Sequence, residues 1–278
     1  MQQRAASGIT LAIKKFSDLP LSIGSVQVQH LNKIVIKEIY LTDEEGDTAI
    51  GIPKITAHLS PLYMLKGDVQ VNTLIVGNPA IRLYRKEKGS PLNIQFLIDK
   101  LSGDSTKQAS ITPDIRINQI QIYEGTARYD VGERKKEETT LFDPEHIYVD
   151  NFFANLSLKK FKNDSIAMHI RSLSGRENCG FNLNRITADI NATKEAIKIN
   201  KLQITLPNSK ISSGGITINS KKGGNCIVKG SVHGKQITPA DFATFLPTLA
   251  DKTLPNAEFK ATINGNAKKS NAEISFAG

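Results

Sequence analysis

Residues 115–123 are IRINQIQIY, a stretch in which apolar and polar side chains alternate with one interruption. The apolar positions are Ile115, Ile117, Ile120 and Ile122, so a doubled polar pair separates the second isoleucine from the third. In a regular strand, residues two apart share a face but residues three apart do not. An α-helix fits no better, because residues two apart on a helix point to opposite sides. A β-bulge at the doubled pair would absorb one residue and return all four isoleucines to one face.

The same spacing, apolar at i, i+2, i+5 and i+7, recurs in LSIGSVQV, IVIKEIYL, VQVNTLIV, IYVDNFFA, FNLNRITA and IKINKLQI. The distances between these stretches are too irregular for a solenoid with a fixed repeat length. The pattern predicts a mostly β protein, with a long curved antiparallel sheet and a few short amphipathic helices. We expect bulges at the doubled pairs Lys37-Glu38, Asn72-Thr73, Asn118-Gln119 and Asn200-Lys201. The alternatives are two short strands for each stretch, or strands covered on both faces, as in a sandwich.

Turn-forming residues at 43–48, 76–79, 123–126 and 218–225 predict chain reversals between strands. Short amphipathic helices are expected at 5–18, after Ser90-Pro91, and at 238–249. In the last of these, Thr238 has the spacing of an N-cap residue, and Phe242, Phe245 and Leu246 would be buried. Such helices usually pack on the core, although they could also cover one end of a groove.

The composition of the 278 residues is that of a globular protein, with 39% hydrophobic and 23% charged residues. The net charge is +9, carried by lysines and arginines in short polar segments. This charge indicates either a solvated basic surface or a preference for anionic partners, such as lipid head groups. No apolar run reaches the roughly 18 residues of a membrane span, and the first residues do not resemble a signal peptide. The chain is therefore either cytosolic or a segment without its export signal.

The motifs of catalytic and metal sites are missing from the sequence. The five histidines are isolated, and no nucleophile elbow, P-loop or dinucleotide-binding glycine motif is present. We expect no enzyme, no metal and no cofactor. Cys179 and Cys226 could form a disulfide in an oxidising compartment or remain free thiols. Nucleic acid is not an expected partner, because the strand interiors are aliphatic and provide no aromatic platforms for base stacking.

A curved sheet with one aliphatic face suits acyl chains, which need apolar surface without specific hydrogen bonds. We therefore expect an open hydrophobic groove, whose lining comes from the repeated positions. These are Ile34, Ile36, Ile39, Leu41, Val69, Val71, Leu74, Val76, Ile115, Ile117, Ile120, Ile122, Ile147, Val149, Ile197, Ile199, Leu202 and Ile204.

The order of elements in residues 5–132 resembles the N-terminal part of AsmA-like proteins, and most closely the TamB family of translocation and assembly proteins. The matching pieces are IGSVQV, IVIKEIYLTDEEGDT, SPLYMLKG, VQVNTLIVGNPAIRLYR and LNIQFLIDKL, in that order, and the similarity is thinner to the end of the chain. The resemblance implies a periplasmic protein, anchored in the inner membrane by an N-terminal helix, whose groove conducts phospholipid toward the outer membrane. In some members, an Omp85-type barrel contacts the C-terminal end.

The membrane anchor of the family is missing, and family members are much longer. The expected organisation is therefore one continuous β-groove segment over 1–278, excised from a longer chain. It would contain the AsmA-like part at about 19–132 and further groove strands at about 133–278. The expected function is non-enzymatic phospholipid transport between the inner and outer membranes. The alternative is a structural or chaperone-like β scaffold that assists outer-membrane protein assembly without carrying lipid.

Overall fold

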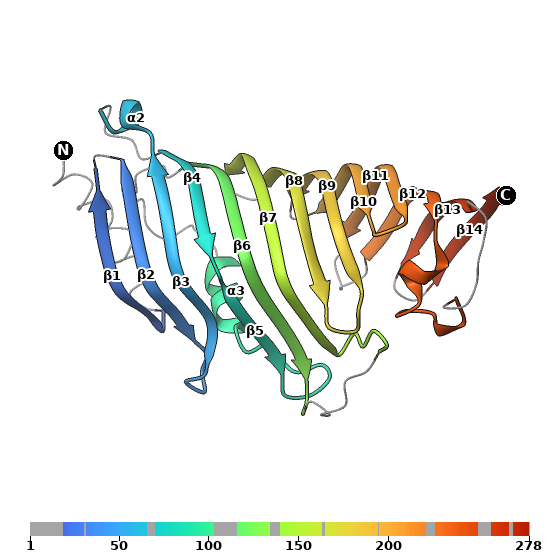
Figure 1. Cartoon of the computed structure of the whole chain (residues 1–278), viewed down its shortest axis with the longest axis horizontal. Helices are drawn as coiled ribbons and strands as arrows, with labels where there is room; N and C mark the ends of the chain where they lie inside the picture. The colour runs from blue at the N-terminus through green and yellow to red at the C-terminus, as the bar shows by residue number, and fades with distance from the viewer. Residues whose placement is uncertain are drawn as a thin grey trace. The chain divides into compact units, whose positions relative to one another are not determined.

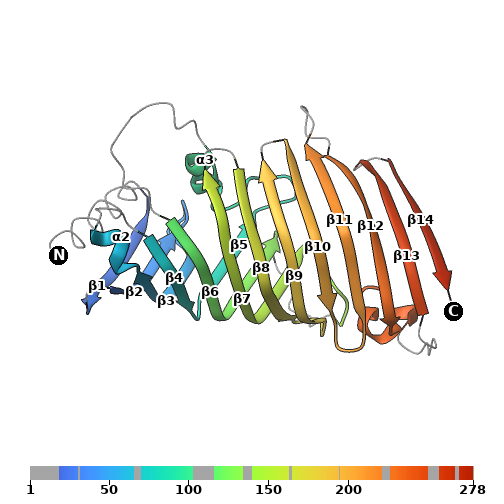
Figure 2. The ribbon, with the colours of Figure 1, turned by 90° about the horizontal axis from the view of Figure 1, so that it is seen from above.

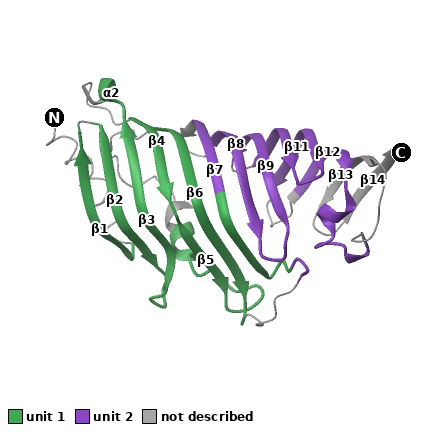
Figure 3. Cartoon of the chain, in the orientation of Figure 1, with its two compact units in different colours: residues 1–137, 143–152 green, residues 138–142, 153–278 purple. Residues whose placement is uncertain are grey.

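The structure is a computed structural model. It describes residues 19–30, 32–65, 70–102, 116–133, 140–162, 165–193, 195–220, 226–249, 257–266 and 269–277. The helix expected at 5–18 lies outside these residues. The chain is mostly β, as expected, and divides into two compact units (Figure 3). Unit 1 comprises residues 1–137 and 143–152, and unit 2 comprises residues 138–142 and 153–278.

Unit 1 is a mixed sheet in which the strands follow the order β1-β2-β3-β4-β6, and β5 pairs with β3 and β6 (Figure 1). Its strands are β1 (Leu21–Gln29), β2 (Lys33–Thr42), β3 (Thr48–Leu59), β4 (Gln70–Gly77), β5 (Ala80–Arg85) and β6 (Arg116–Val131). Two short helices, α2 (Pro61–Leu65) and α3 (Gln95–Ser102), follow β3 and β5. Strand β7 (His146–Lys162) begins in unit 1 and continues in unit 2.

The sheet of unit 1 is not entirely antiparallel, which corrects the expectation from the sequence. Strands β4 and β5 both run parallel to β6. Parallel neighbours need a crossover connection of a dozen or more residues. The segment between β5 and β6, which contains α3, provides one. The sequence of α3 and of the polar residues around it does not indicate which strands β6 will pair with.

Residues 76–79 and 123–126 do not reverse the chain, which is a second correction. Strand β6 runs through Glu124, and β4 and β5 lie end to end along it. Asn78 and Glu124 both adopt positive φ, 51° and 53°, and the Asn78 amide donates a hydrogen bond of 2.9 Å to the Glu124 carboxylate. One left-handed residue between β4 and β5, and one within β6, produce a matched kink, whereas a type I′ hairpin turn needs two such residues in succession.

Unit 2 contains the rest of β7 and the order β8-β9-β10-β11-β12-β13-β14, in which each strand from β8 onward pairs antiparallel with the next (Figure 2). The strands are β8 (Ser165–Glu177), β9 (Asn182–Thr193), β10 (Ala196–Thr205), β11 (Lys210–Ser220), β12 (Cys226–Ile237), β13 (Ala257–Asn266) and β14 (Lys269–Ala277). Two 3-10 turns, η1 (Pro239–Phe242) and η2 (Pro247–Leu249), connect β12 to β13.

The single helix expected at 238–249 is wrong. The segment forms the two 3-10 turns instead, because Pro247 lacks an N–H and disfavours a helical conformation in the preceding residue. Thr238 makes no side-chain cap; its hydroxyl donates to the carbonyl of Asn208 at 3.3 Å. Phe245 and Leu246 are exposed rather than buried.

The helix expected after Ser90 forms, but it begins later than predicted, at Gln95. The Ser90 hydroxyl bonds to the backbone of Glu87 in a turn, so it does not cap α3. None of the helices among the described residues is long and apolar enough to span a membrane.

Two of the expected bulges form, at Asn72-Thr73 and at Asn200-Lys201. His58 pairs with Thr73 and Leu59 with Val71, so β4 contains one extra residue, Asn72, relative to β3. The pairing of β10 with β9 shifts between Asn200 and Gln203. Lys201, in the β10 bulge, has a left-handed φ of 51°. At Lys37-Glu38 the expected bulge does not form: β2 pairs with β1 and with β3 without a shift across this pair, although Glu38 has a φ of 57°. The pairing of β6 with β4 also continues without a shift across Asn118-Gln119.

Candidate functional site

The bulge in β10 places residues five apart on one face of the sheet. Ile199 lies opposite Ile190 of β9, and Ile204 lies opposite Ile186. Directly opposed residues of an antiparallel pair share a face. Ile186 and Ile190 are four residues apart on β9, so their side chains point the same way. It follows that Ile199 and Ile204 also share that face.

The same face of unit 2 is aliphatic from β8 to β12, and we call its residues the apolar ladder. Its rows follow the cross-strand pairing, for example Ile166–Ala192–Ile197–Ile218–Val228. The apolar ladder consists of Ile166, Met168, Ile170, Leu173, Ile186, Ala188, Ile190, Ala192, Ile197, Ile199, Leu202, Ile204, Ile211, Ile216, Ile218 and Val228.

Most side chains of the apolar ladder are only half-buried, and its buried members are Ile170 of β8 and Ala188 of β9. Ile166 and Ile197 keep 37% and 40% of their surface exposed. Large contiguous apolar patches on soluble proteins generally belong to interaction surfaces, which makes this face the candidate site of unit 2.

The apolar face of unit 1 is more closed. Ile34, Ala57, Leu59 and Val71 are buried in one cluster, and Leu74 and Ile117 pack against it. Val71 and Leu74 lie on either side of the bulge at Asn72, so the bulge brings both sides of β4 to the same cluster. This cluster is filled by the protein's own side chains.

The predicted lining residues therefore differ in their exposure. Ile34, Ile39, Leu41, Val71 and Val76 are buried. Ile36, Leu74, Ile117, Ile120, Ile122, Ile147, Val149, Ile199, Leu202 and Ile204 are half-buried, and Ile197 is exposed. Val69 and Ile115 lie outside the residues whose side chains the structure describes.

The spacing i, i+2, i+5, i+7 missed part of the apolar ladder. Ile166, Met168 and Ile170 of β8 alternate without interruption, as do Ile216 and Ile218 of β11. Plain alternation is the signal that could have identified them. The spacing also did not predict the burial of Val35, which is 2% exposed. Val35 stands between two other apolar residues, so the sequence shows no alternation at this point.

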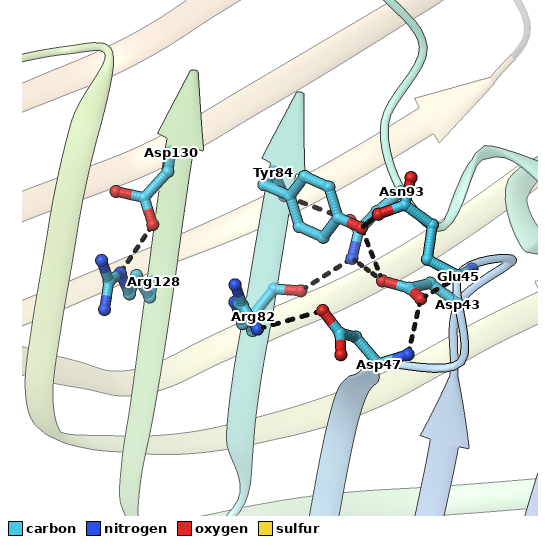
Figure 4. A network of polar contacts seen from close by, with 8 residues as sticks. All are labelled: Asp43, Glu45, Asp47, Arg82, Tyr84, Asn93, Arg128 and Asp130. Carbon is cyan, nitrogen blue, oxygen red and sulfur yellow. Dashed lines mark hydrogen bonds and ion pairs between the residues drawn. The ribbon is translucent and has the colours of Figure 1, made fainter. Parts of the chain in front are cut away.

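A polar network in unit 1 is centred on the carboxylate of Asp43 (Figure 4). One oxygen, Oδ1, accepts hydrogen bonds from the backbone of Glu45 at 3.1 Å and of Asp47 at 2.9 Å. The other, Oδ2, accepts from the Tyr84 hydroxyl at 3.0 Å and the Asn93 amide at 3.3 Å. The network fastens the β2–β3 turn to β5 and to the segment before α3.

The protonation of this network follows from its contacts. Burial alone would raise the pKa of Asp43, but the hydrogen bonds from Asn93, Tyr84 and the backbone outweigh it, and its pKa lies below the usual value. Burial, followed by the hydrogen bonds to Glu45 and Asp43, raises the pKa of Tyr84. Asp43 is thus a carboxylate that serves as an acceptor, and Tyr84 is a neutral donor.

A cavity of about 550 Å³ adjoins this network and is lined by acidic loop residues, Tyr84, Lys86 and residues 90–99. Lys86 is held by an ion pair with Glu45, and Arg82 lies 3.6 Å from Asp47. Within the part of the chain that the structure describes, no group of histidine, cysteine and acidic side chains could hold a metal ion. These contacts hold the β2–β3 turn against β5. They do not identify a ligand or a reaction for the cavity.

In unit 2, polar residues lie on the face opposite the apolar ladder. Asp189 accepts from His169 Nδ1 at 2.9 Å and from Lys159 at 3.4 Å, and Lys201 lies 3.5 Å from it. Burial alone would raise the pKa of Asp189. The hydrogen bond from His169 and the charge of Lys159 outweigh this effect, so the pKa of Asp189 lies below its usual value. Cys179 is a free thiol in this structure, and the side chain of Cys226 lies outside those that the structure describes.

Comparison of the chain with protein-family models, curated proteins and solved structures finds no match. The apolar ladder is therefore chosen as the candidate site on its geometry alone. It is a partly exposed aliphatic face that runs across neighbouring strands.

Proposed function

We propose that this chain is a non-enzymatic lipid-binding module that holds phospholipid acyl chains against the apolar ladder during transport through the bacterial envelope. The observation that carries the proposal is the half-exposure of the aliphatic rows from β8 to β12. Acyl chains are complementary to such a face, because they bury apolar area and require no hydrogen bonds.

The dimensions and energies of the ladder support this ligand. Neighbouring strands lie about 4.8 Å apart, so the ladder from β8 to β12 is roughly 19 Å wide. An acyl chain in one leaflet spans about half of the ~30 Å hydrocarbon core of a bilayer, and it fits within this width. Each methylene transferred from water to an apolar surface contributes about 0.8 kcal/mol when it is fully buried. A shallow face buries each methylene only in part, which suits a carrier that must release its ligand.

The cellular setting belongs to the proposal and rests on the resemblance to AsmA-like proteins. By this resemblance, the module would lie in the periplasm of a Gram-negative bacterium, as part of a longer chain that is anchored in the inner membrane. Phospholipid would pass toward the outer membrane, where an Omp85-type barrel is a candidate partner of regions beyond these residues. Nucleic acid is not among the proposed partners.

The alternative function is a β scaffold that assists outer-membrane protein assembly without carrying lipid. The filled cluster around Ile34, Leu59 and Val71 favours it for unit 1, because side chains occupy the space that lipid would need. The proposal of acyl-chain binding therefore concerns unit 2 first.

The test uses two variants of β10 that each add one negative charge. Ile197→Asp places the charge on the apolar ladder, and Gln203→Asp places it on the opposite, exposed face of the same strand. Phospholipid that copurifies with the full chain is extracted and quantified by mass spectrometry, and the melting temperature is recorded. We expect the Ile197→Asp protein to lose most of its phospholipid with a nearly unchanged melting temperature, while the Gln203→Asp protein keeps both.

A parent protein without phospholipid, or an Ile197→Asp protein that keeps it, would contradict acyl-chain binding. A collapsed melt of the Ile197→Asp protein would indicate a closed core and would also contradict it.

A further inference from the structure

The face of unit 2 opposite the apolar ladder is basic. Residues that alternate with the ladder point to this face. One row is formed by Arg185, Thr205, Lys210 and Lys235, which pair successively from β9 to β12. A second row also runs from β9 to β12 and is formed by Asn191, Lys198, Thr217 and Lys229. We call Arg185, Lys198, Lys201, Lys210, Lys229 and Lys235 the basic face, and all of them are exposed.

The charges of the basic face are largely uncompensated. Lys198, Lys210, Lys229 and Lys235 form no ion pair with any residue in the described part of the chain. The Arg185 guanidinium donates to a backbone carbonyl, that of Arg171, at 3.0 Å. Among the described residues, Lys201 is the one member of the basic face that lies within 4 Å of a carboxylate, and it shares Asp189 with Lys159 and His169.

One contact within the face disfavours folding. Lys210 and Lys235 lie directly opposite each other on β11 and β12. Like charges at directly opposed positions repel and destabilise a sheet. A bound anionic partner would relieve this repulsion. The charges of the basic face are spread over the four strands β9 to β12, so they suit an extended anionic surface better than one small ion.

The chemistry of the face distinguishes between anionic partners. Strands β8–β12 contain no Phe, Tyr or Trp, so they provide no platform for the bases of a single-stranded nucleic acid. Most of the charge is carried by lysine, a hydrated point charge that follows a surface potential and does not form the paired contacts of arginine with an individual phosphate. Polybasic surfaces of this composition bind membranes that contain anionic lipids.

We propose that the basic face docks unit 2 on a bilayer surface that contains anionic phospholipid. The apolar ladder then faces away from that surface on the same strands. This inference rests on the charge pattern and not on acyl-chain binding, so the two proposals can fail separately.

The experiment is cosedimentation of the full chain with vesicles of phosphatidylglycerol and phosphatidylcholine, and with vesicles of phosphatidylcholine alone. The test variant is Lys210→Gln with Lys235→Gln. The matched control is Lys37→Gln with Lys54→Gln, which removes an exposed and directly opposed lysine pair from unit 1. Each lysine near an anionic membrane contributes about 1 kcal/mol, so the test variant should bind about 25-fold more weakly. The control should keep the parent's affinity, and raised salt should weaken binding of the parent.

Three results would overturn the proposal. The first is equal binding of the parent to neutral and anionic vesicles, and the second is an equal loss of affinity in the test variant and the control. The third is tighter binding of the parent to a single-stranded oligonucleotide than to anionic vesicles. Copurified phospholipid is measured on the same variants. Its retention in a variant that no longer sediments with vesicles would show that docking and acyl-chain binding are separate.

Discussion

Ile199 and Ile204 face the same side of the sheet although they are five residues apart on β10. They lie opposite Ile190 and Ile186 of β9, and the pairing shifts by one residue between them. Lys201, with a φ of 51°, is the residue at which this happens. The bulge thus determines which side chains form the apolar ladder, and several predictions about stability depend on it.

The left-handed conformation of Lys201 predicts an unusual response to glycine. A non-glycine residue in this conformation costs roughly 1–2 kcal/mol, so Lys201→Gly should leave the free energy of unfolding unchanged or raise it by up to ~1 kcal/mol. Lys198→Gly, at a regular position of the same strand, should lower it by about 0.5–1 kcal/mol. Urea unfolding of both variants measures the difference. Equal destabilisation by the two glycines would argue against a bulge at Lys201.

Gly125 in β6 is predicted to tolerate no side chain. A Cβ atom at this position would come within 2.4 Å of the Phe152 ring. Gly125→Ala should therefore lower the free energy of unfolding by roughly 1–3 kcal/mol, as for other overpacked sites. A second substitution, Phe152→Leu, should recover part of that loss. If Gly125→Ala is neutral, or Phe152→Leu only adds to its effect, the ring does not cover the glycine.

Val71 should not accept a charge. It is 6% exposed and lies within the cluster of unit 1. Val71→Asp should cost several kcal/mol and unfold unit 1, because it leaves an unpaired charge in an apolar site. Asn72→Asp adds the same charge at the next, exposed residue and should have little effect. Circular dichroism melts would separate the two cases, and a stable Val71→Asp protein would mean that water reaches this cluster.

The hydrogen bonds of Asp43 predict a pH-dependent contribution to stability. Its pKa in the folded protein is below the ordinary value of 3.8. A lowered pKa gives stability that is present above pH ~4 and is lost as the pH falls through the folded value. Asp43→Asn should thus lower the free energy of unfolding by about 1–3 kcal/mol at pH 7 and by less near pH 3. A loss that is the same at both pH values would show that the charge of Asp43 is not what stabilises the turn.

The sequence predicted those features that depend on local alternation. The doubled polar pairs at 72–73 and 200–201 indicated the bulges, because no regular strand or helix places the flanking apolar residues together. The turns expected at 76–79 and 123–126 were wrong, since Asn78 and Glu124 kink paired strands instead of reversing the chain. Asparagine and glycine permit positive φ in both situations, and local sequence does not distinguish them.

The degree of coverage could not be predicted. Val71 and Ile199 occupy equivalent positions in their repeats, yet Val71 is buried and Ile199 is only half-buried. Alternation shows which way a side chain points, but the neighbouring elements decide what lies over it. The parallel pairing of β4 with β6 is equally non-local, because it depends on the crossover through α3.

The most direct test of the central claim is site-specific photocrosslinking in living cells with labelled phospholipid. A photoreactive phenylalanine analogue replaces Ile199 on the apolar ladder or Lys37, which is exposed in unit 1 and lies outside the basic face. Acyl-chain binding to the ladder predicts labelled phospholipid on the protein crosslinked at position 199 and little on that crosslinked at position 37. Equal labelling at the two positions, or none at position 199 in a folded protein, would contradict it.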